Sequence, residues 1–186
     1  MSFVETNRLF LRKVAPADYP YFREYLMDKE MDRMMLRTPC RTEEAVRQGF
    51  DWFLTREPRA YAIIYKESSQ IIGNLTVYDN VPQNVAAQPC VRGKRGKSLS
   101  FAISPRWQRK GLMYEAVCAV IEHIFQEESI DYISCGYLSN NLPSKALQEK
   151  LGFHMLFSEK FLFNGQEIEA VENVLWKPDT AAPTRF

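Results

Sequence analysis

The segment from Pro105 to Ala116, P-R-W-Q-R-K-G-L-M-Y-E-A, constrains the fold most, because it leads from a strand through a short basic turn directly into a helix. Ser98–Ser104 is predicted as the strand, and Gly111–Glu127 carries apolar residues at helical spacing. The first backbone N–H groups of a helix lack partners within it and lie at the positive end of its dipole. With Arg109 and Lys110 beside them, they predict a phosphate or pyrophosphate site. An ordinary strand–turn–helix with solvated basic residues is the alternative.

Several classes of protein are disfavoured by the rest of the sequence. The turn has neither the G-x-x-x-x-G-K-[ST] pattern of nucleotide hydrolases nor the G-x-G-x-x-G pattern of dinucleotide sites. A net charge of +1 argues against a globally electropositive nucleic-acid binder. Four scattered cysteines and two histidines form no metal-site signature, so no metal is expected. The start of the sequence lacks the features of a secretory leader and no long apolar run occurs, so we expect a cytoplasmic protein without a membrane segment. The oligomeric state is left open between a monomer and a homodimer.

The remaining elements follow from hydrophobic periodicity and turn signals. Asn80 to Lys97, which contains Pro82, Pro89, Gly93 and Gly96, is predicted as a long surface loop. The pattern predicts an α/β (α+β) protein with one domain over residues 1–177 and a frayed tail over 178–186. The other predicted strands are Arg8–Val14, Ala60–Lys66, Gln70–Tyr78, Tyr132–Tyr137, and a hairpin of Phe153–Phe163 and Glu167–Trp176 around Asn164-Gly165. The other helices are expected around Tyr21–Leu26, after Thr42 as the N-terminal cap, and over Asn141–Leu151.

Three segments resemble one known family. Gln108–Met113 resembles the Q/R-x-x-G-x-G/A signature of GNAT acetyltransferases, although Met113 stands where glycine or alanine is usual. Asn141–Phe153 resembles the family's N-x-x-S…E-K-L-G-F segment. Glu5–Arg12 is similar to the E-T-x-R-L-x-L-R start of the RimJ/RimL-like branch, which includes acetylases of ribosomal-protein N-termini. The matches occur in the expected order and cover nearly the whole chain.

The resemblance implies a mixed, mostly antiparallel central sheet of about six to seven strands flanked by about four helices. It also implies direct transfer of an acetyl group from acetyl-CoA, as co-substrate, to a primary amine. In the family, backbone N–H groups of the strand before the turn stabilise the thioester carbonyl, and the turn holds the pyrophosphate. Ser144 matches a candidate proton donor to the thiolate, and Tyr137 is a weaker catalytic candidate. The residues assigned to the coenzyme are Phe101, Ala102, Ile103, Gln108, Arg109, Lys110, Gly111, Leu112, Met113, Asn141, Ser144 and Lys150.

Structural alternatives stand beside these assignments. Asn141 and Ser144 are also suited to starting a helix, as cap and first-turn residue. Ser98 occupies the position where many relatives of the family carry a glutamate that acts as the general base. Glu115 matches a glutamate that is common in this helix of the family and has a structural role there. The basic cluster Arg92–Lys97 fits the coenzyme's 3′-phosphate, an acidic acceptor, rRNA near a ribosomal substrate, or simply a solvated loop.

The acceptor is therefore left open between a protein N-terminus and a small-molecule amine. The serine at position 98 and the methionine at position 113 motivate a further alternative, a non-catalytic acyl-CoA-binding or regulatory module. The intact N-x-x-S…K-L-G-F segment argues against that alternative.

Overall fold

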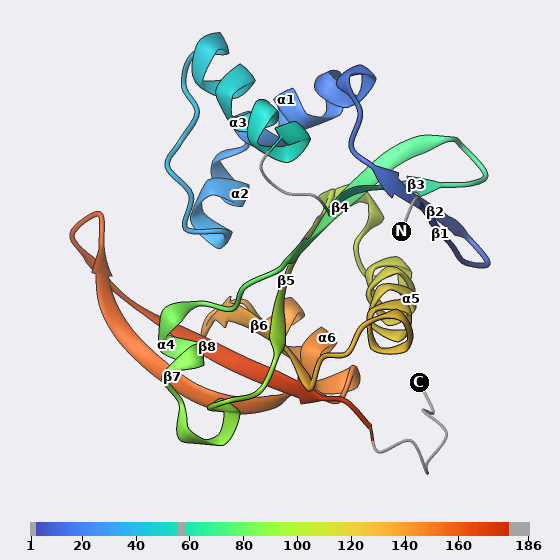
Figure 1. Ribbon diagram of the computed structural model, residues 1–186. Coiled ribbons are helices and arrows are strands. Elements are labelled where there is room, and N and C mark those ends of the chain that lie inside the picture. The colour runs from blue at the N-terminus through green and yellow to red at the C-terminus, as the bar shows by residue number, and fades with distance from the viewer. Residues whose placement is uncertain (1–2, 56–58, 179–186) are drawn as a thin grey trace. The chain divides into compact units, whose positions relative to one another are not determined.

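The computed structural model describes residues 3–55 and 59–178 (Figure 1). Its strands form one sheet in the order β1-β2-β3-β4-β5-β6-β8-β7. The chain divides into two compact units: the first comprises Met1–Thr76 and Phe101–Ala116, and the second comprises Val77–Ser100 and Val117–Phe186. Strands β4 and β5 and helix α5 run from one unit into the other.

The first unit combines antiparallel strands with a group of helices. Strand β2 pairs with β1 on one side and with β3 on the other, and β3 pairs with β4. Phe22 of α1 and Phe50 of α3 are buried against each other, with ring centroids 5.4 Å apart. The predicted cap of α3 is confirmed, because the Thr42 hydroxyl accepts a hydrogen bond from the Ala45 N–H at 3.1 Å. The elements are β1 (Phe3–Glu5), β2 (Leu9–Lys13), α1 (Tyr19–Met27), α2 (Lys29–Met34), α3 (Glu43–Thr55), β3 (Ala60–Tyr65), most of β4 (Gln70–Tyr78), the end of β5 and the start of α5.

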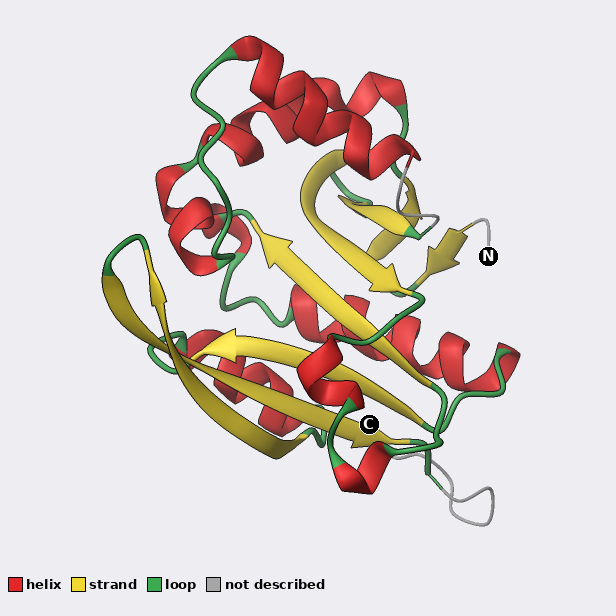
Figure 2. Cartoon of the chain, turned by 60° about the vertical axis from the view of Figure 1, so that its left-hand side comes forward, coloured by secondary structure: helices red, strands yellow, loops and turns green. Residues whose placement is uncertain are grey.

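The second unit is built around β6 and a long hairpin. Strand β5 pairs with β6 in parallel, and β8 pairs antiparallel with both β6 and β7. Figure 2 shows β7 and β8 as one long, bent hairpin. Asn164 and Gly165 both have positive φ, 51° and 77°, which confirms the predicted turn. The elements are α4 (Gln83–Ala86), η2 (Pro89–Val91), most of β5 (Gly96–Ile103), the greater part of α5 (Leu112–Glu127), β6 (Tyr132–Leu138), α6 (Leu142–Lys150), β7 (His154–Phe163) and β8 (Gln166–Trp176).

The sequence-based counts of strands and helices were too low. The sheet has eight strands rather than six to seven, because the three-residue β1 is too short to show an alternating pattern. Within residues 3–55 and 59–178, six α-helices are present rather than about four, the additional ones being the short α2 and α4. The predicted loop over 80–97 is partly wrong, since it contains α4 and η2 and since β5 already begins at Gly96.

The single domain over residues 1–177 stays a prediction. The expected frayed tail lies outside the described residues from position 179 onward. None of the described helices is long and apolar enough to cross a membrane.

Candidate functional site

The basic turn has an unusual backbone. The short helix η3 (Pro105–Trp107) follows β5, and Arg109 and Gly111 then adopt positive φ angles of 61° and 74° before α5 begins. The Glu115 N–H donates to the Gly111 carbonyl at 3.1 Å, so the amides of Leu112 and Met113 precede this first intrahelical bond. These amides lie at the positive end of a long helix, beside Arg109 and Lys110. The predicted strand–turn–helix is confirmed, and its geometry suits an anion.

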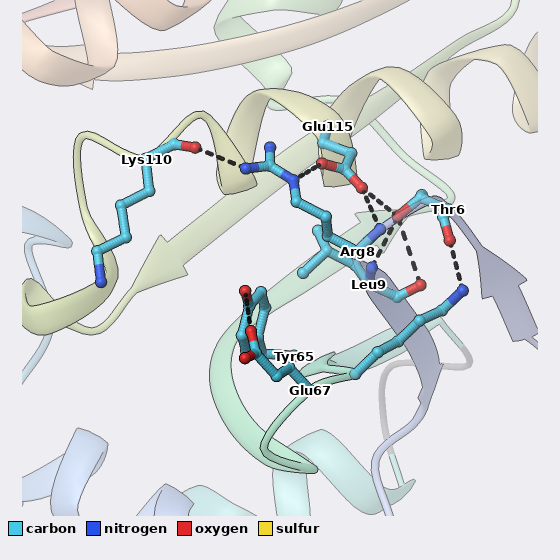
Figure 3. A network of polar contacts seen from close by, with 8 residues as sticks. Thr6, Arg8, Leu9, Tyr65, Glu67, Lys110 and Glu115 are labelled. Atoms are coloured by element: carbon cyan, nitrogen blue, oxygen red, sulfur yellow. Dashed lines mark hydrogen bonds and ion pairs between the residues drawn. The ribbon is translucent and has the colours of Figure 1, made fainter.

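The N-terminal motif is tied to this turn by hydrogen bonds (Figure 3). Glu115 Oε1 accepts from the Thr6 hydroxyl at 2.6 Å and from the Arg8 N–H at 2.8 Å, and Oε2 accepts from Arg8 Nε at 2.6 Å. Arg8 Nη1 then donates to the Lys110 carbonyl at 3.0 Å. Burial of Glu115 opposes its ionisation, but the hydrogen bonds from Thr6 and Arg8 outweigh it and hold its pKa below the usual value. Glu115 therefore has a structural role, fixing one carbonyl of the turn through Arg8.

The strand end before the turn approaches a neighbour closely. A Cβ added to Gly73 of β4 would lie 2.6 Å from the Ala102 carbonyl, so only glycine permits this backbone approach. The Ser104 N–H donates to the Ile72 carbonyl at 2.8 Å. The segment containing Phe101, Ala102 and Ile103 is thereby held firmly within the first unit.

Side chains around the turn are also positioned. Met113, at the position that departs from the family pattern, is 8% exposed, so its side chain is buried rather than projecting over the turn. Lys110 Nζ lies 4.8 Å from the centre of the Trp107 ring, a cation–π arrangement. Gln108 Nε2 donates to the Ile103 carbonyl at 3.4 Å.

Asn141 and Ser144 begin a hydrogen-bonded chain in the second unit. Asn141 caps α6, its Oδ1 accepting from the Ser144 N–H at 3.2 Å, so its expected helix-start role is confirmed. Ser144 Oγ accepts from Gln148 Nε2 at 3.2 Å, and Gln148 Oε1 accepts from Asn173 Nδ2 at 3.0 Å. Gln148 is fully buried. Because the Ser144 hydroxyl accepts within this chain, its own proton is available to donate.

Tyr137 lines a cavity of about 470 Å³ in the same unit, together with Lys145, Glu149, His154 and Asn173. Burial and the negative charge of Glu149 raise the pKa of Tyr137, against a hydrogen bond with Asn173. The phenol therefore stays neutral at physiological pH. Lys150 is exposed in the last turn of α6, where its charge complements the helix dipole.

One carboxyl near this region was missed by the sequence-based prediction. Glu172 of β8 pairs with Gly136 of β6, where an added Cβ would collide with Glu172 Oε1. Its Oε2 is buried and has no hydrogen-bond partner among the described residues. Burial and the neighbouring Glu159 carboxylate raise the pKa of Glu172 to about 7. The only signal in the sequence was a glutamate in an alternating strand, a pattern that also fits a solvent-facing position.

The other candidates have separate structural environments. Ser98 is buried in β5 and pairs with Ser134. The basic cluster does not form one exposed patch: the Lys97 ammonium is buried in ion pairs with Asp79 and Glu128, and Lys94 Nζ lies 5.6 Å from the centre of the Trp176 ring. Across residues 3–55 and 59–178, no group of three or more His, Cys, Asp or Glu side chains could hold a metal ion.

Comparison with known proteins identifies relatives of this chain. The family model described as "Acetyltransferase (GNAT) domain" matches residues 8–154. Over 83 residues, the chain is 34% identical to the [ribosomal protein uS5]-alanine N-acetyltransferase of Escherichia coli (strain K12). That match covers 44% of this chain and 43% of the relative, so it spans less than half of the relative's length.

Solved structures share the fold at lower identity. An acetyltransferase (GNAT family) from Bacillus anthracis superposes with a TM-score of 0.78 at 18% identity, covering 94% of this chain and 98% of that one. RimL, described as a ribosomal L7/L12 alpha-N-protein acetyltransferase in complex with coenzyme A, superposes with a TM-score of 0.72 at 14% identity, covering 94% and 97%. At such identities these likenesses show the fold alone.

Proposed function

The chain belongs to the GNAT acetyltransferase family, and on that premise we propose that it transfers the acetyl group of acetyl-CoA directly to a primary amine. The observation that carries this proposal is the turn before α5, where Arg109 and Gly111 have positive φ and Arg8 holds the Lys110 carbonyl. Such a turn presents backbone amides and positive charge to a pyrophosphate.

We assign the coenzyme's phosphates and carbonyl to residues of β5 and of the turn before α5. The turn from Gln108 to Met113 binds the pyrophosphate through its amides and through the charges of Arg109 and Lys110. Among Phe101, Ala102 and Ile103, a backbone N–H that faces the coenzyme donates to the thioester oxygen, on which negative charge develops during attack. The close approach at Gly73 supports this assignment, because it fixes the strand end before the substrate arrives.

We assign the thiol end of the coenzyme to residues of β6 and α6. Asn141 contacts the pantetheine arm, and Lys150 adds a positive charge for the coenzyme. Ser144 protonates the leaving thiolate, with Tyr137 as the alternative donor. The chain from Ser144 through Gln148 to Asn173 supports the role of Ser144, because it holds the hydroxyl oxygen in one orientation.

The acceptor that we favour is the N-terminal amine of a protein. The matched relative acts, by its name, on an alanine of ribosomal protein uS5, and the motif at Glu5–Arg12 is similar to that branch. The buried Ser98, at the position of the usual glutamate, is the observation that favours a non-catalytic acyl-CoA-binding module instead.

A thiol-release assay with acetyl-CoA tests the proposal. Peptides beginning with alanine, the same peptides with a blocked N-terminus, and a polyamine are offered as acceptors. We expect turnover on the free N-termini and none on the blocked peptides. Turnover on the polyamine alone would change the acceptor class, and tight acetyl-CoA binding without turnover on any amine would favour the module.

A further inference from the structure

Glu172 faces away from helix α6. The next residue along β8, Asn173, donates to Gln148 of α6, and successive side chains of a strand point to opposite faces of the sheet. Glu172 therefore lies on the face opposite the helix that carries Ser144. On that face its carboxylate rests over Gly136, which has no side chain to displace it.

Gly136 lies in the part of β6 that extends beyond its pairing with β5. The parallel pairs run from Gly96↔Tyr132 to Ser98↔Ser134, and β6 continues for four more residues to Leu138. Tyr137 follows Gly136 directly, and the strand then leads to the cap of α6 at Asn141. The carboxylate of Glu172 therefore lies against the stretch of β6 that leads to Tyr137 and then to the cap of α6.

The surroundings of Glu172 suit a proton acceptor. Glu159 on β7 and the Cys135 thiol on β6 are the titratable groups that interact with it, and neither carries a positive charge. Val174 lies two residues after Glu172 on the same face of β8, and the valines of the segment Val81–Val91 pack against it. Asn84 of that segment donates a hydrogen bond to the Glu159 carboxylate. Burial together with the Glu159 charge raises the pKa of Glu172 to about 7, near the value at which a general base is most effective in neutral solution.

We propose that Glu172 is the catalytic base that takes a proton from the acceptor amine, in place of the glutamate missing at position 98. This inference rests on the proposed acetyl transfer. The Glu172 carboxylate accepts one proton from the incoming ammonium, and the freed nitrogen lone pair attacks the thioester carbonyl carbon. A C–N bond forms and the C–S bond breaks, so that sulfur leaves with the electron pair. Ser144 protonates that sulfur and regains a proton from the amine nitrogen, and Glu172 releases its own proton to solvent.

The test compares Glu172→Gln with the matched variant Glu159→Gln on the same face of the hairpin. We expect Glu172→Gln to lower kcat by about 100-fold or more, while the acetyl-CoA dissociation constant stays unchanged. Glu159→Gln should retain most of the turnover but move the acidic limb of the pH–rate profile to lower pH, because it removes a like charge. An unchanged kcat in Glu172→Gln overturns the inference.

The unmodified protein provides an independent readout. Its pH–rate profile should rise through about pH 7, and this limb should stay in place when a peptide α-amine is exchanged for a more basic alkyl amine. A limb that follows the pKa of the acceptor would overturn the inference while leaving acetyl transfer intact. Absence of turnover on any amine would instead refute the proposed function, and the inference with it.

Discussion

Arg8 and Glu115 are joined by two hydrogen bonds, from the Arg8 backbone N–H at 2.8 Å and from its Nε at 2.6 Å. This pair explains why a motif at the start of the chain bears on the turn before α5. The arginine that Glu115 orients is the same side chain that holds the Lys110 carbonyl. The Lys110 carbonyl is therefore already hydrogen-bonded to Arg8. The backbone N–H groups of the turn are the groups that we expect to bind the anion.

Arg8→Lys keeps the positive charge but cannot reproduce the forked contact with Glu115 and Lys110. We expect the acetyl-CoA dissociation constant to rise about fivefold, equivalent to about 1 kcal/mol for one lost hydrogen bond. Isothermal titration calorimetry measures the change. The control is Lys160→Arg, in an exposed pair with Glu167 on the β7–β8 hairpin, which should leave binding unaltered. Equal affinities for the wild type and Arg8→Lys would show that the contact does not shape the turn.

Gly111 allows charge to be separated from backbone strain at the anion site. Its φ of 74° favours glycine, and an added Cβ would meet nothing nearer than Arg8 Nη2 at 3.6 Å. Asparagine and aspartate tolerate this conformation similarly and have nearly the same shape. We expect Gly111→Asp to weaken acetyl-CoA binding more than tenfold relative to Gly111→Asn, because its carboxylate repels the pyrophosphate. If the two variants bind equally, the pyrophosphate lies elsewhere.

Local signals in the sequence predicted much of the fold. Thr42 as a cap, Asn141 as a cap and Asn164-Gly165 as a turn are all confirmed, because each acts through backbone groups within a few residues. Helix α2 was not predicted. Its first turn depends on Asp28, which accepts from the N–H groups of Glu30 and Met31, and such a short helix shows little periodicity.

The candidate site was predictable only where its residues are contiguous. The turn from Gln108 to Gly111 is one local segment, and the apolar residues that follow it at helical spacing predicted the long helix that it begins. Glu172 became a candidate only because the strand register places it over Gly136. Pairing between strands that are distant in the sequence cannot be predicted from either segment alone. The same applies to the bond from Gln148 to Asn173, which joins a helix to a strand.

Ser144→Ala tests whether the hydroxyl acts in chemistry or only in the fold. We expect kcat to fall at least tenfold while the acetyl-CoA dissociation constant changes little, because the lost group protonates the thiolate. Thermal unfolding should show a loss of no more than about 1 kcal/mol, since Gln148 loses one neutral partner. Ser158→Ala, at an exposed position of β7, is the matched control and should match the wild type. A stability loss with full activity would assign Ser144 to the start of α6 alone.

Lys97 is predicted to matter for stability rather than for binding anions. Its ammonium is buried in ion pairs with Asp79 and, at 3.0 Å, with Glu128. Lys97→Met should lower the free energy of unfolding by about 3 kcal/mol, because two carboxylates lose their shared cation. Lys94→Met, in the same basic cluster but exposed, should cost well under 1 kcal/mol. Urea denaturation measures both, and a small effect of Lys97→Met would contradict a structural role.

The raised pKa of Glu172 also predicts how stability depends on pH. A glutamate in the unfolded chain titrates near 4.3, whereas folded Glu172 titrates at about 7. Between these values the native state binds more protons than the unfolded state, so this group's contribution to stability is fully present below about pH 4 and is lost as the pH rises through about 7. Glu172→Gln removes that loss, because glutamine stays neutral. Urea denaturation from pH 5 to pH 8 should therefore show the variant gaining stability over the wild type as the pH rises. A constant difference across this range would mean that Glu172 is ionised throughout and that its burial does not hold a proton.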